Sequence, residues 1–280
     1  MKPYQGKFPD INTPVFTQSN IKTAEDCMFL LYKLKGEGVS SLPGVAATLG
    51  NAYHKGIEVG LIARIKGGAD LPLKDKLEAA CEEFRRLREA TYWDPWDDYD
   101  NEQKLLMLYT KLHHERVAPK LRPKQVELFL TQSFPGYTLS GTIDLIESDN
   151  TICDHKTSKR PYDLRACENS TQAAVYSKLF ELHFGSKPKT FRYDVIIKPS
   201  LKFQHISGLP KEATMSLLEY RITVLLSEWR NSLALGQWRL AREGHWRCKD
   251  KWCGLYRDGT CPKSPDYQKK GDPLNYVKSP

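Results

Sequence analysis

The 280-residue sequence has no long apolar segment, no internal repeat and no low-complexity tract. No run approaches the ~18 consecutive apolar residues that a membrane span requires, so we expect no membrane insertion. The first residues, Met1 to Gln5, lack the apolar centre of a secretory signal peptide. These absences predict a protein that stays in the cytoplasm.

Cysteine is also scarce. The seven cysteines are scattered along the chain and are too few for a disulfide scaffold. We therefore expect free thiols and at most one metal site. Cys81, Cys153 and Cys167 are interpreted as ordinary core or loop thiols.

Positive charge is in excess, with a net charge of +8 at pH 7. This excess favours a polyanionic partner such as nucleic acid, although many basic proteins never bind one. A hydrophobic content of 40% over this length is enough for a sizeable core. The composition therefore predicts one large domain, or one domain with an appendage.

Helical periodicity dominates the first part of the chain, and strand periodicity begins near Lys124. Residues 1–20 are rich in proline and polar side chains, and Thr23 is expected to cap the first helix. This order predicts an α/β or α+β architecture with a mixed sheet. The predicted helices cover residues 23–36, 45–64, 74–90, 101–118, 171–184 and 211–235, and the predicted strands cover residues 126–130, 137–146, 151–156, 191–198 and 203–209.

Two of the predicted strands each carry an aspartate among apolar neighbours. Asp144 and Asp154 lie on either side of a polar turn, and Lys156 shares a strand face with Asp154 because side chains two apart point the same way. A buried aspartate can simply cap a turn, and a lysine after a strand often only solvates an edge. However, two acids buried without a cation are costly, and carboxylates suit Mg²⁺ or Mn²⁺. The pattern favours a metal site able to cleave phosphodiester bonds.

A histidine lies on an apolar helical stripe upstream of these strands. Gly50 and Ala47 precede His54 at helical spacing, and these small residues are expected to let the helix approach another element closely. On the residues alone, a histidine hydrogen-bonded at a helix–sheet contact is the favoured interpretation. His113 and His114 lie among charged residues and are expected at the surface.

Five motifs occur in an order and spacing that we find in one nuclease family. They are Gly50-x-x-x-His54, Glu127, Gly141-x-x-Asp144, Asp154-x-Lys156 and Gln172-x-x-x-Tyr176. Over roughly residues 20–262 the chain resembles the PD-(D/E)XK nuclease superfamily, and within it the RecB-type exonucleases and the iron–sulfur nucleases of CRISPR adaptation. Ile143 stands where the superfamily's name has proline, and Asp154 stands where other members have glutamate.

The resemblance implies an α/β fold with a restriction-endonuclease-like core, in which helices flank a central mixed β-sheet. The N-terminal region is then helical, and the C-terminal segment is rich in cysteine. The implied units are an arm at 1–20, a helical region at 21–122 that supplies His54, the nuclease core at 123–240, a cysteine-rich metal-binding segment at 241–262 and a flexible tail at 263–280.

The resemblance also implies roles for the motif residues. Asp144 and Asp154 are expected to bind Mg²⁺ or Mn²⁺ directly, with the His155 main-chain carbonyl and the His54 imidazole as further ligands. Lys156 is expected to activate or orient the attacking water. Three residues are expected to assist: Glu127 supports the site without binding the metal, and Gln172 and Tyr176 contact DNA or brace the catalytic loop.

Three cysteines, Cys248, Cys253 and Cys261, lie in a short C-terminal segment punctuated by glycine and tryptophan. One more thiolate would complete a four-cysteine metal site. The iron–sulfur relatives take that thiolate from an early helix, which implies Cys27 and a [4Fe–4S] cluster. Gaps of four and seven residues between the three cysteines are wider than in those relatives. A zinc site and plain free thiols stay open as alternatives.

Basic and aromatic residues follow the second aspartate strand. Lys159, Arg160 and Arg165 are expected to contact DNA phosphates, and Tyr162 to stack on an unpaired base. The leading hypothesis is a metal-dependent DNA exonuclease that acts on ends or single strands in recombination, repair or phage DNA metabolism, in a bacterial or phage-infected cell. The alternatives are a DNA-binding or assembly module that does not cut, and a CRISPR- or restriction-associated endonuclease. The sequence does not predict an oligomeric state.

Overall fold

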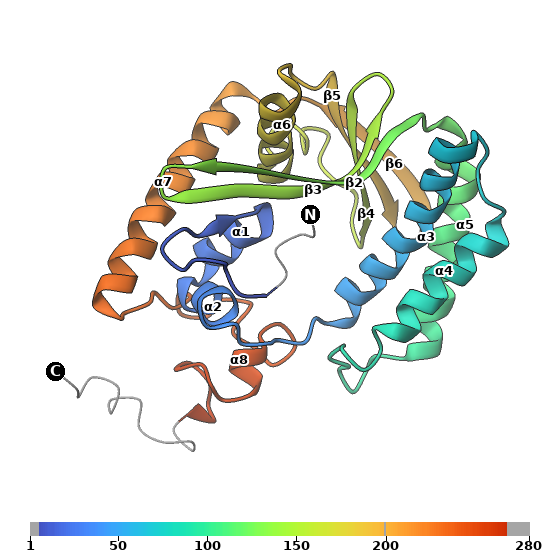
Figure 1. Cartoon of the computed structure of the whole chain (residues 1–280). Helices are drawn as coiled ribbons and strands as arrows, with labels where there is room; N and C mark the ends of the chain where they lie inside the picture. Colours follow the sequence, from blue (N-terminus) through green and yellow to red (C-terminus); the bar gives the residue numbers. More distant parts are fainter. Residues whose placement is uncertain (1–5, 199, 268–280) are drawn as a thin grey trace.

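A mixed β-sheet organises the chain in the computed structural model, which describes residues 6–198 and 200–267 (Figure 1). Its neighbouring strands run in the order β1, β3, β4, β5, β6, and β2 pairs with β3. Only β1 with β3 and β4 with β5 are parallel pairs. The strands are β1 (Val15–Phe16), β2 (Pro123–Phe134), β3 (Tyr137–Glu147), β4 (Thr151–Ser158), β5 (Thr190–Ile197) and β6 (Lys202–Gly208).

Strand β3 pairs with three strands, β1, β2 and β4. We call the point where β3 and β4 separate the fork. One of its edges pairs with β2 along nearly the whole length. The other edge pairs with β1 at Thr138 and Leu139, and with β4 only at Leu145 and Ile146. Beyond this short ladder β3 and β4 diverge, so Asp144 lies just where the two strands separate.

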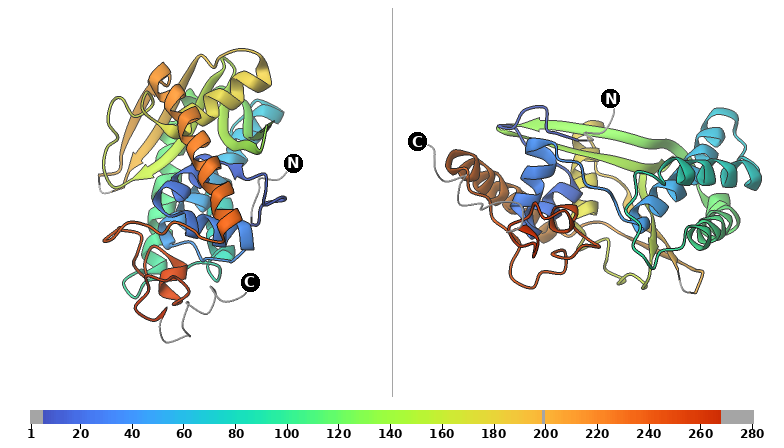
Figure 2. Two further views of the ribbon diagram at one scale, coloured as in Figure 1. Left: turned by 90° about the vertical axis from the view of Figure 1, so that its left-hand side faces the viewer. Right: turned by 90° about the horizontal axis from the view of Figure 1, so that it is seen from below.

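Helices cover both faces of the sheet (Figures 1 and 2). On one face α3, α4 and α5 share an apolar core with Leu145, Cys153 and Ile196. On the other face α6, α7 and α1 share a core with Ile143 and the inward residues of β5. The helices are α1 (Gln18–Asp26), α2 (Met28–Leu31), α3 (Val45–Gly67), α4 (Leu73–Arg86), α5 (Tyr99–Arg116), α6 (Thr171–Phe184), α7 (Glu212–Leu235) and α8 (Gly254–Arg257), with a π-helix at Tyr32–Glu37 and a 3₁₀ turn at Ala118–Lys120.

The parallel strands β4 and β5 are joined through α6, because parallel neighbours need a crossover rather than a hairpin. Ser170 begins α6 as its cap: the hydroxyl accepts a hydrogen bond from the Ala173 amide at 3.2 Å. This crossover brings Gln172, in the first turn of α6, to Asp154 in the middle of β4.

The two ends of the chain lie together. In Figure 1 the C-terminal segment (red) runs beside α1 and α2 (blue). The Phe29 amide donates to the Arg239 carbonyl at 3.0 Å, and the Arg247 guanidinium pairs with Asp26. The segment after α7 is therefore held to the N-terminal helices rather than to the sheet.

The structure confirms the predicted mixed sheet flanked by helices, with two differences in the N-terminal region. Val15–Phe16 is a strand and α1 begins at Gln18, so the segment predicted as an arm is ordered in its second half. Thr17 rather than Thr23 caps α1, because its extended backbone lets the hydroxyl accept from the Asn20 amide. Of the predicted tail, residues 268–280 lie outside the described part of the chain. Within that part, no helix is long and apolar enough to cross a bilayer.

Candidate metal centre

The divergence of β3 and β4 brings the two aspartates of the sequence motif together. Asp144 Oδ2 accepts a hydrogen bond from the His155 amide at 3.0 Å, which replaces a ladder bond where the strands part. Asp154 is fully buried one residue earlier on β4, and Lys156 Nζ lies 2.7 Å from its Oδ2. The predicted acidic pair and lysine therefore share one site.

Helix α3 contributes His54 from the opposite side of the fork. Its Nε2 lies 2.8 Å from the His155 carbonyl oxygen, and its Nδ1 lies 3.4 Å from Asp144 Oδ2. The glycines that allow close packing of α3 come later than predicted. A Cβ added at Gly56 would lie 2.9 Å from the Ala80 Cβ, whereas one at Gly50 would meet nothing within 4 Å.

Glu127 lies closer to the site than the sequence indicates. Its strand neighbours Val126 and Leu128 pair with Leu145 and Ile143, so Glu127 lies opposite Asp144. It has a positive φ of 50°, a left-handed conformation that is strained for a residue with a Cβ. Ligand atoms of His54, Glu127 and Asp144 all lie within 4.8 Å of one another. Glu127 thus joins the candidate ligands instead of lying behind them.

Negative charge is concentrated at this point. Burial raises the pKa of Asp154 to about 6, opposed by Lys156 and reinforced by Asp144. Desolvation and the charges of Asp144 and Glu58 raise the pKa of Glu127, although its side chain stays exposed to solvent. Burial alone would lower the pKa of Lys156, but the two aspartates outweigh burial and raise it. Lys156 therefore stays protonated.

Helix α6 supports the aspartate pair. Gln172 Nε2 donates to Asp154 Oδ1 at 2.7 Å, and the same nitrogen lies 3.3 Å from the Tyr176 hydroxyl. The ring of Tyr176 lies directly over β3, where a Cβ added at Gly141 would come within 2.8 Å of it. Glycine in the Gly141-x-x-Asp144 motif is thus explained by the close approach of α6.

The donor set fits a small hard cation. Carboxylate oxygens, a main-chain carbonyl and an imidazole nitrogen converge on one point, and oxygen donors of this kind suit Mg²⁺ or Mn²⁺. Crowded carboxylates raise one another's pKa when no cation lies between them, as they do for Asp154 and Glu127. A divalent ion would relieve that repulsion.

Two further residues of this region differ from what the sequence predicts: Glu58 was not predicted, and His113 was predicted in the wrong place. Glu58 follows His54 by one helical turn and lines a small cavity together with His54 and Asp144. An acid one turn after the histidine is the sequence feature that could have indicated it. The prediction that His113 is a surface residue is wrong. It is buried on the inner side of α5 with its ring 4.9 Å from that of His155, and burial lowers its pKa so that it stays neutral.

The predicted DNA contacts lie in the loop after β4. Lys159, Arg160 and Arg165 are exposed there. Tyr162 packs edge-on against Tyr193 with ring centroids 5.4 Å apart, and its amide donates to the Gln204 side chain. The three cations are free to meet a phosphate chain, whereas the Tyr162 ring already has a packing partner.

The four cysteines proposed as a set line one small cavity between the chain ends: Cys27, Cys248, Cys253 and Cys261. They are free thiols, and burial raises the pKa of Cys261 to about 11, as buried thiols without a metal should show. Among the described residues, no three of these sulfur atoms all lie within 4.8 Å of one another. Zinc–sulfur bonds of ~2.3 Å in a tetrahedron require a spacing of about 3.8 Å. The four thiols are therefore gathered around one cavity, but no three of their sulfurs have the close spacing of a bound zinc ion.

Known proteins match this chain both in sequence and in fold. The model of the PD-(D/E)XK nuclease superfamily matches residues 15–262. The chain is similar in fold to the crystal structure of a "Putative exonuclease" from Eubacterium rectale, with a TM-score of 0.57 and 11% identity over 96% of this chain and 94% of that chain. A crystal structure of SSO0001 aligns with a TM-score of 0.34 and 14% identity over 76% of this chain and 84% of that chain, which is too low for an argument. No curated protein matches the sequence.

Proposed function

The chain belongs to the PD-(D/E)XK nuclease superfamily, and we propose that it is a metal-dependent DNA exonuclease whose active centre is the fork between β3 and β4. The observation that carries this proposal is the convergence of Asp144, Asp154 and Lys156 with His54. A chain that only bound DNA would gain nothing from two crowded acids, because carboxylates repel phosphates.

In this proposal His54, Glu127, Asp144 and Asp154 hold Mg²⁺ or Mn²⁺, together with the His155 carbonyl. When bound, the ion polarises a phosphoryl oxygen and makes a bound water more acidic. The chain's own residues orient these ligands. Gln172 fixes the Asp154 carboxylate by donating to Oδ1, which leaves Oδ2 for Lys156 and the ion.

Lys156 acts in this proposal as a fixed cation. Because its pKa is raised, it does not take a proton from water at neutral pH. Instead its ammonium group can hold the attacking water by a hydrogen bond and offset the negative charge that develops on the phosphoryl group. Tyr176 closes the site from the α6 side and positions Gln172.

The cysteine set is proposed to bind a [4Fe–4S] cluster through Cys27, Cys248, Cys253 and Cys261. The meeting of the four cysteines around one cavity between the chain ends supports a shared metal group. Bound there, the group supplies a covalent link between the two chain ends. Anaerobically purified protein should be brown and contain iron and sulfide, whereas colourless protein with stoichiometric zinc would exclude the cluster.

The proposed setting is DNA processing in recombination, repair or phage DNA metabolism, in the cytoplasm of a bacterial or phage-infected cell. The fold likeness to a protein named as an exonuclease supports action at DNA ends over internal cleavage. Digestion of end-labelled linear DNA and of closed circular DNA with Mg²⁺ or Mn²⁺ separates the two.

We expect linear DNA to be degraded and circular DNA to survive. Asp154→Ala and Lys156→Ala should each abolish degradation. Cleavage that is equally fast in both variants would show that the site is misassigned, and salt-sensitive DNA binding without any turnover would favour a non-cutting module.

A further inference from the structure

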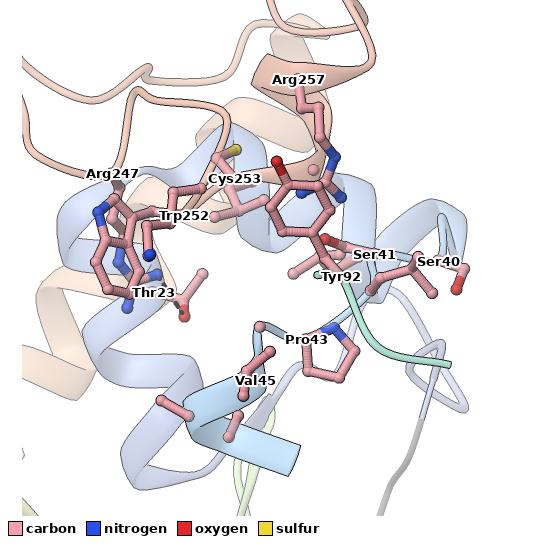
Figure 3. A pocket seen from close by; sticks show the side chains of 18 of the residues that line it. Thr23, Ser40, Ser41, Pro43, Val45, Tyr92, Arg247, Trp252, Cys253 and Arg257 are labelled. Carbon is pink, nitrogen blue, oxygen red and sulfur yellow. Dashed lines mark hydrogen bonds between the residues drawn. The ribbon is translucent and has the colours of Figure 1, made fainter. Parts of the chain in front are cut away.

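A large cavity in the described part of the chain lies outside the metal centre. It encloses about 1120 Å³ and opens between the loop before α3, the residues around Tyr92 and the cysteine-rich segment (Figure 3). Trp252 and Arg257 line it from the cysteine-rich side, and Pro43 and Val45 line it from the α3 side. Nothing in the catalytic proposal uses this cavity.

The two walls are in tight contact at one point. A Cβ added at Gly254 would lie 2.5 Å from Ser41 Oγ, so α8 can meet the loop before α3 only because glycine stands there. Arg257 lies over the Tyr92 ring at 3.7 Å and bonds the Asp250 carbonyl, which fixes the same corner. The shape of the cavity therefore depends on the cysteine-rich segment.

The lining is strongly basic. It includes six cations and only two acids, Asp97 and Glu102. Some cations are already paired: Arg247 contacts Asp26 at 3.0 Å, and Lys251 lies 3.5 Å from Asp94. Even so, the positive excess in a concave surface favours a polyanion. The cations are Lys35, Lys159, Lys198, Arg247, Lys251 and Arg257.

An exposed aromatic ring adds a second kind of contact. Trp252 has 52% of its surface exposed. Lys251 Nζ lies 5.9 Å from its ring, and Trp246 packs edge-on against it at 5.6 Å. A rigid, exposed indole beside cations is the kind of platform on which unpaired bases stack.

Both walls lead to the metal centre. Helix α3 starts at Val45 in the cavity and carries His54 nine residues later, which is about 14 Å at 1.5 Å per residue. Lys159, which lines the cavity from the loop after β4, follows Lys156 by three residues, about 10 Å of extended chain. At about 3.4 Å per stacked nucleotide, the distance of about 14 Å along α3 corresponds to roughly four nucleotides.

We propose that this cavity binds a few unpaired nucleotides of the DNA strand that is being cleaved, with Trp252 stacking on a base and Lys251 and Lys35 contacting phosphates. The cavity is close in size to sites that enclose ligands of a few hundred daltons, which suits a few unpaired nucleotides. The inference rests on the proposed nuclease function for its substrate. It adds that the cysteine-rich segment forms part of the strand-binding site.

The test is binding of a fluorescent oligothymidine of about 16 nucleotides to the full anaerobically purified protein, in Ca²⁺ to prevent turnover. Trp252→Ala should weaken binding about 5- to 100-fold, and Trp252→Phe should restore most of it. Trp96→Ala is the matched control, because Trp96 is equally a surface indole but does not line the cavity. Melting curves check that each variant is folded.

Lys251→Gln should make the dependence of log affinity on log salt concentration shallower by about 0.7 for the lost phosphate contact. Lys187→Gln, at an exposed lysine in the turn before β5, should leave that slope unchanged. Hydrolysis of bis(p-nitrophenyl) phosphate, which reaches the metal centre without filling the cavity, should stay at the wild-type rate in every variant.

Oligothymidine binding by Trp252→Ala and Lys251→Gln that equals the wild type would overturn the proposal, even if the protein cleaves DNA. Equal weakening for single-stranded and blunt duplex DNA would overturn the assignment to an unpaired strand. If the wild type hydrolyses neither DNA nor the small ester while the two variants still lose oligothymidine binding, the catalytic proposal fails and the strand site stands.

Discussion

The candidate metal centre and the cysteine cluster are assembled in opposite ways. The metal centre lies on paired strands of the sheet, where Asp144 and Asp154 are neighbours in sequence and are held by the His155 amide and Gln172. The cysteine cluster joins Cys27 to a segment more than 200 residues away, through loops and four-residue helices. Arg239, the ion pair of Arg247 with Asp26 and an apolar cluster hold those ends together.

This difference predicts which property each region controls. The fold holds the metal-centre residues in place before any ion binds, so the ion serves chemistry more than stability. The cysteine segment has little regular structure of its own beyond α8, so the metal group proposed for it should help to keep the chain ends joined. Variants of the two regions should therefore separate activity from stability.

The largest effect is expected for Asp154→Asn. The substitution keeps the shape of the side chain but removes a ligand charge, so DNA cleavage should fall by about 1000-fold or more. The free energy of unfolding should change by less than about 2 kcal/mol, because a buried charge is lost together with a hydrogen-bonded ion pair. Asp149→Asn, in the exposed turn before β4, is the control and should retain full activity.

The second largest effect is expected for Cys253→Ser, which should lower stability and leave phosphodiester hydrolysis nearly unchanged. Loss of one thiolate should release the bound group and lower the free energy of unfolding by about 3 kcal/mol or more. Hydrolysis of bis(p-nitrophenyl) phosphate per folded molecule should stay near the wild-type rate. Denaturant unfolding measures the change in stability, and iron, sulfide and zinc contents measure the loss of the bound group. Cys81→Ser in α4 is the matched control. Equal stability of both variants would show that the four-cysteine set has no structural role.

A third effect concerns the ion itself. Mn²⁺ at 100 times its dissociation constant should stabilise the protein by about 2.7 kcal/mol, seen as a rise in melting temperature. His54→Ala and Asp144→Asn should lose this rise, because both remove ligands. His183→Ala, at an exposed histidine of α6, should keep it. A rise that survives in His54→Ala would show that His54 does not bind the ion.

The smallest effect compares two glycines of the sequence motifs. Gly141→Ala should destabilise the fold by about 1–3 kcal/mol, because its Cβ would meet the Tyr176 ring at 2.8 Å. Gly50→Ala should be neutral or stabilise by up to about 1 kcal/mol, because no atom lies within 4 Å and alanine favours helix. Thermal unfolding measures both, and destabilisation by Gly50→Ala would contradict the open environment described for it.

The sheet, the helices and the acidic pair could be predicted from the sequence because each rests on a local pattern. Alternation marked β3 and β4, and two-residue spacing put Asp154 and Lys156 on one face. Thr17 and Thr23 both have capping chemistry, so only the backbone conformation at Thr17 separates them. The environment of Gly50 likewise depends on which neighbours the helix meets, and sequence spacing does not contain that information.

Tertiary contacts decided the remaining differences. Glu127 joins the candidate ligands because its positive φ and its register opposite Asp144 turn it toward the fork. His113 looks like a surface residue among charged neighbours, yet it falls on the side of α5 that packs against His155. The large cavity combines residues from many separate parts of the chain, between Gly6 and Arg257, and they form no sequence motif.

The most direct test of the central claim is the metal dependence of DNA cleavage by the intact protein. Divalent ions are removed with a chelator, the iron and zinc contents are checked, and Mg²⁺ or Mn²⁺ is then added back to end-labelled linear DNA. We predict no release of label without the ion, full release after its return, and none at any ion concentration with Asp154→Asn. Cleavage that persists after chelation, or that Asp154→Asn leaves intact, would contradict a metal centre at the fork of β3 and β4.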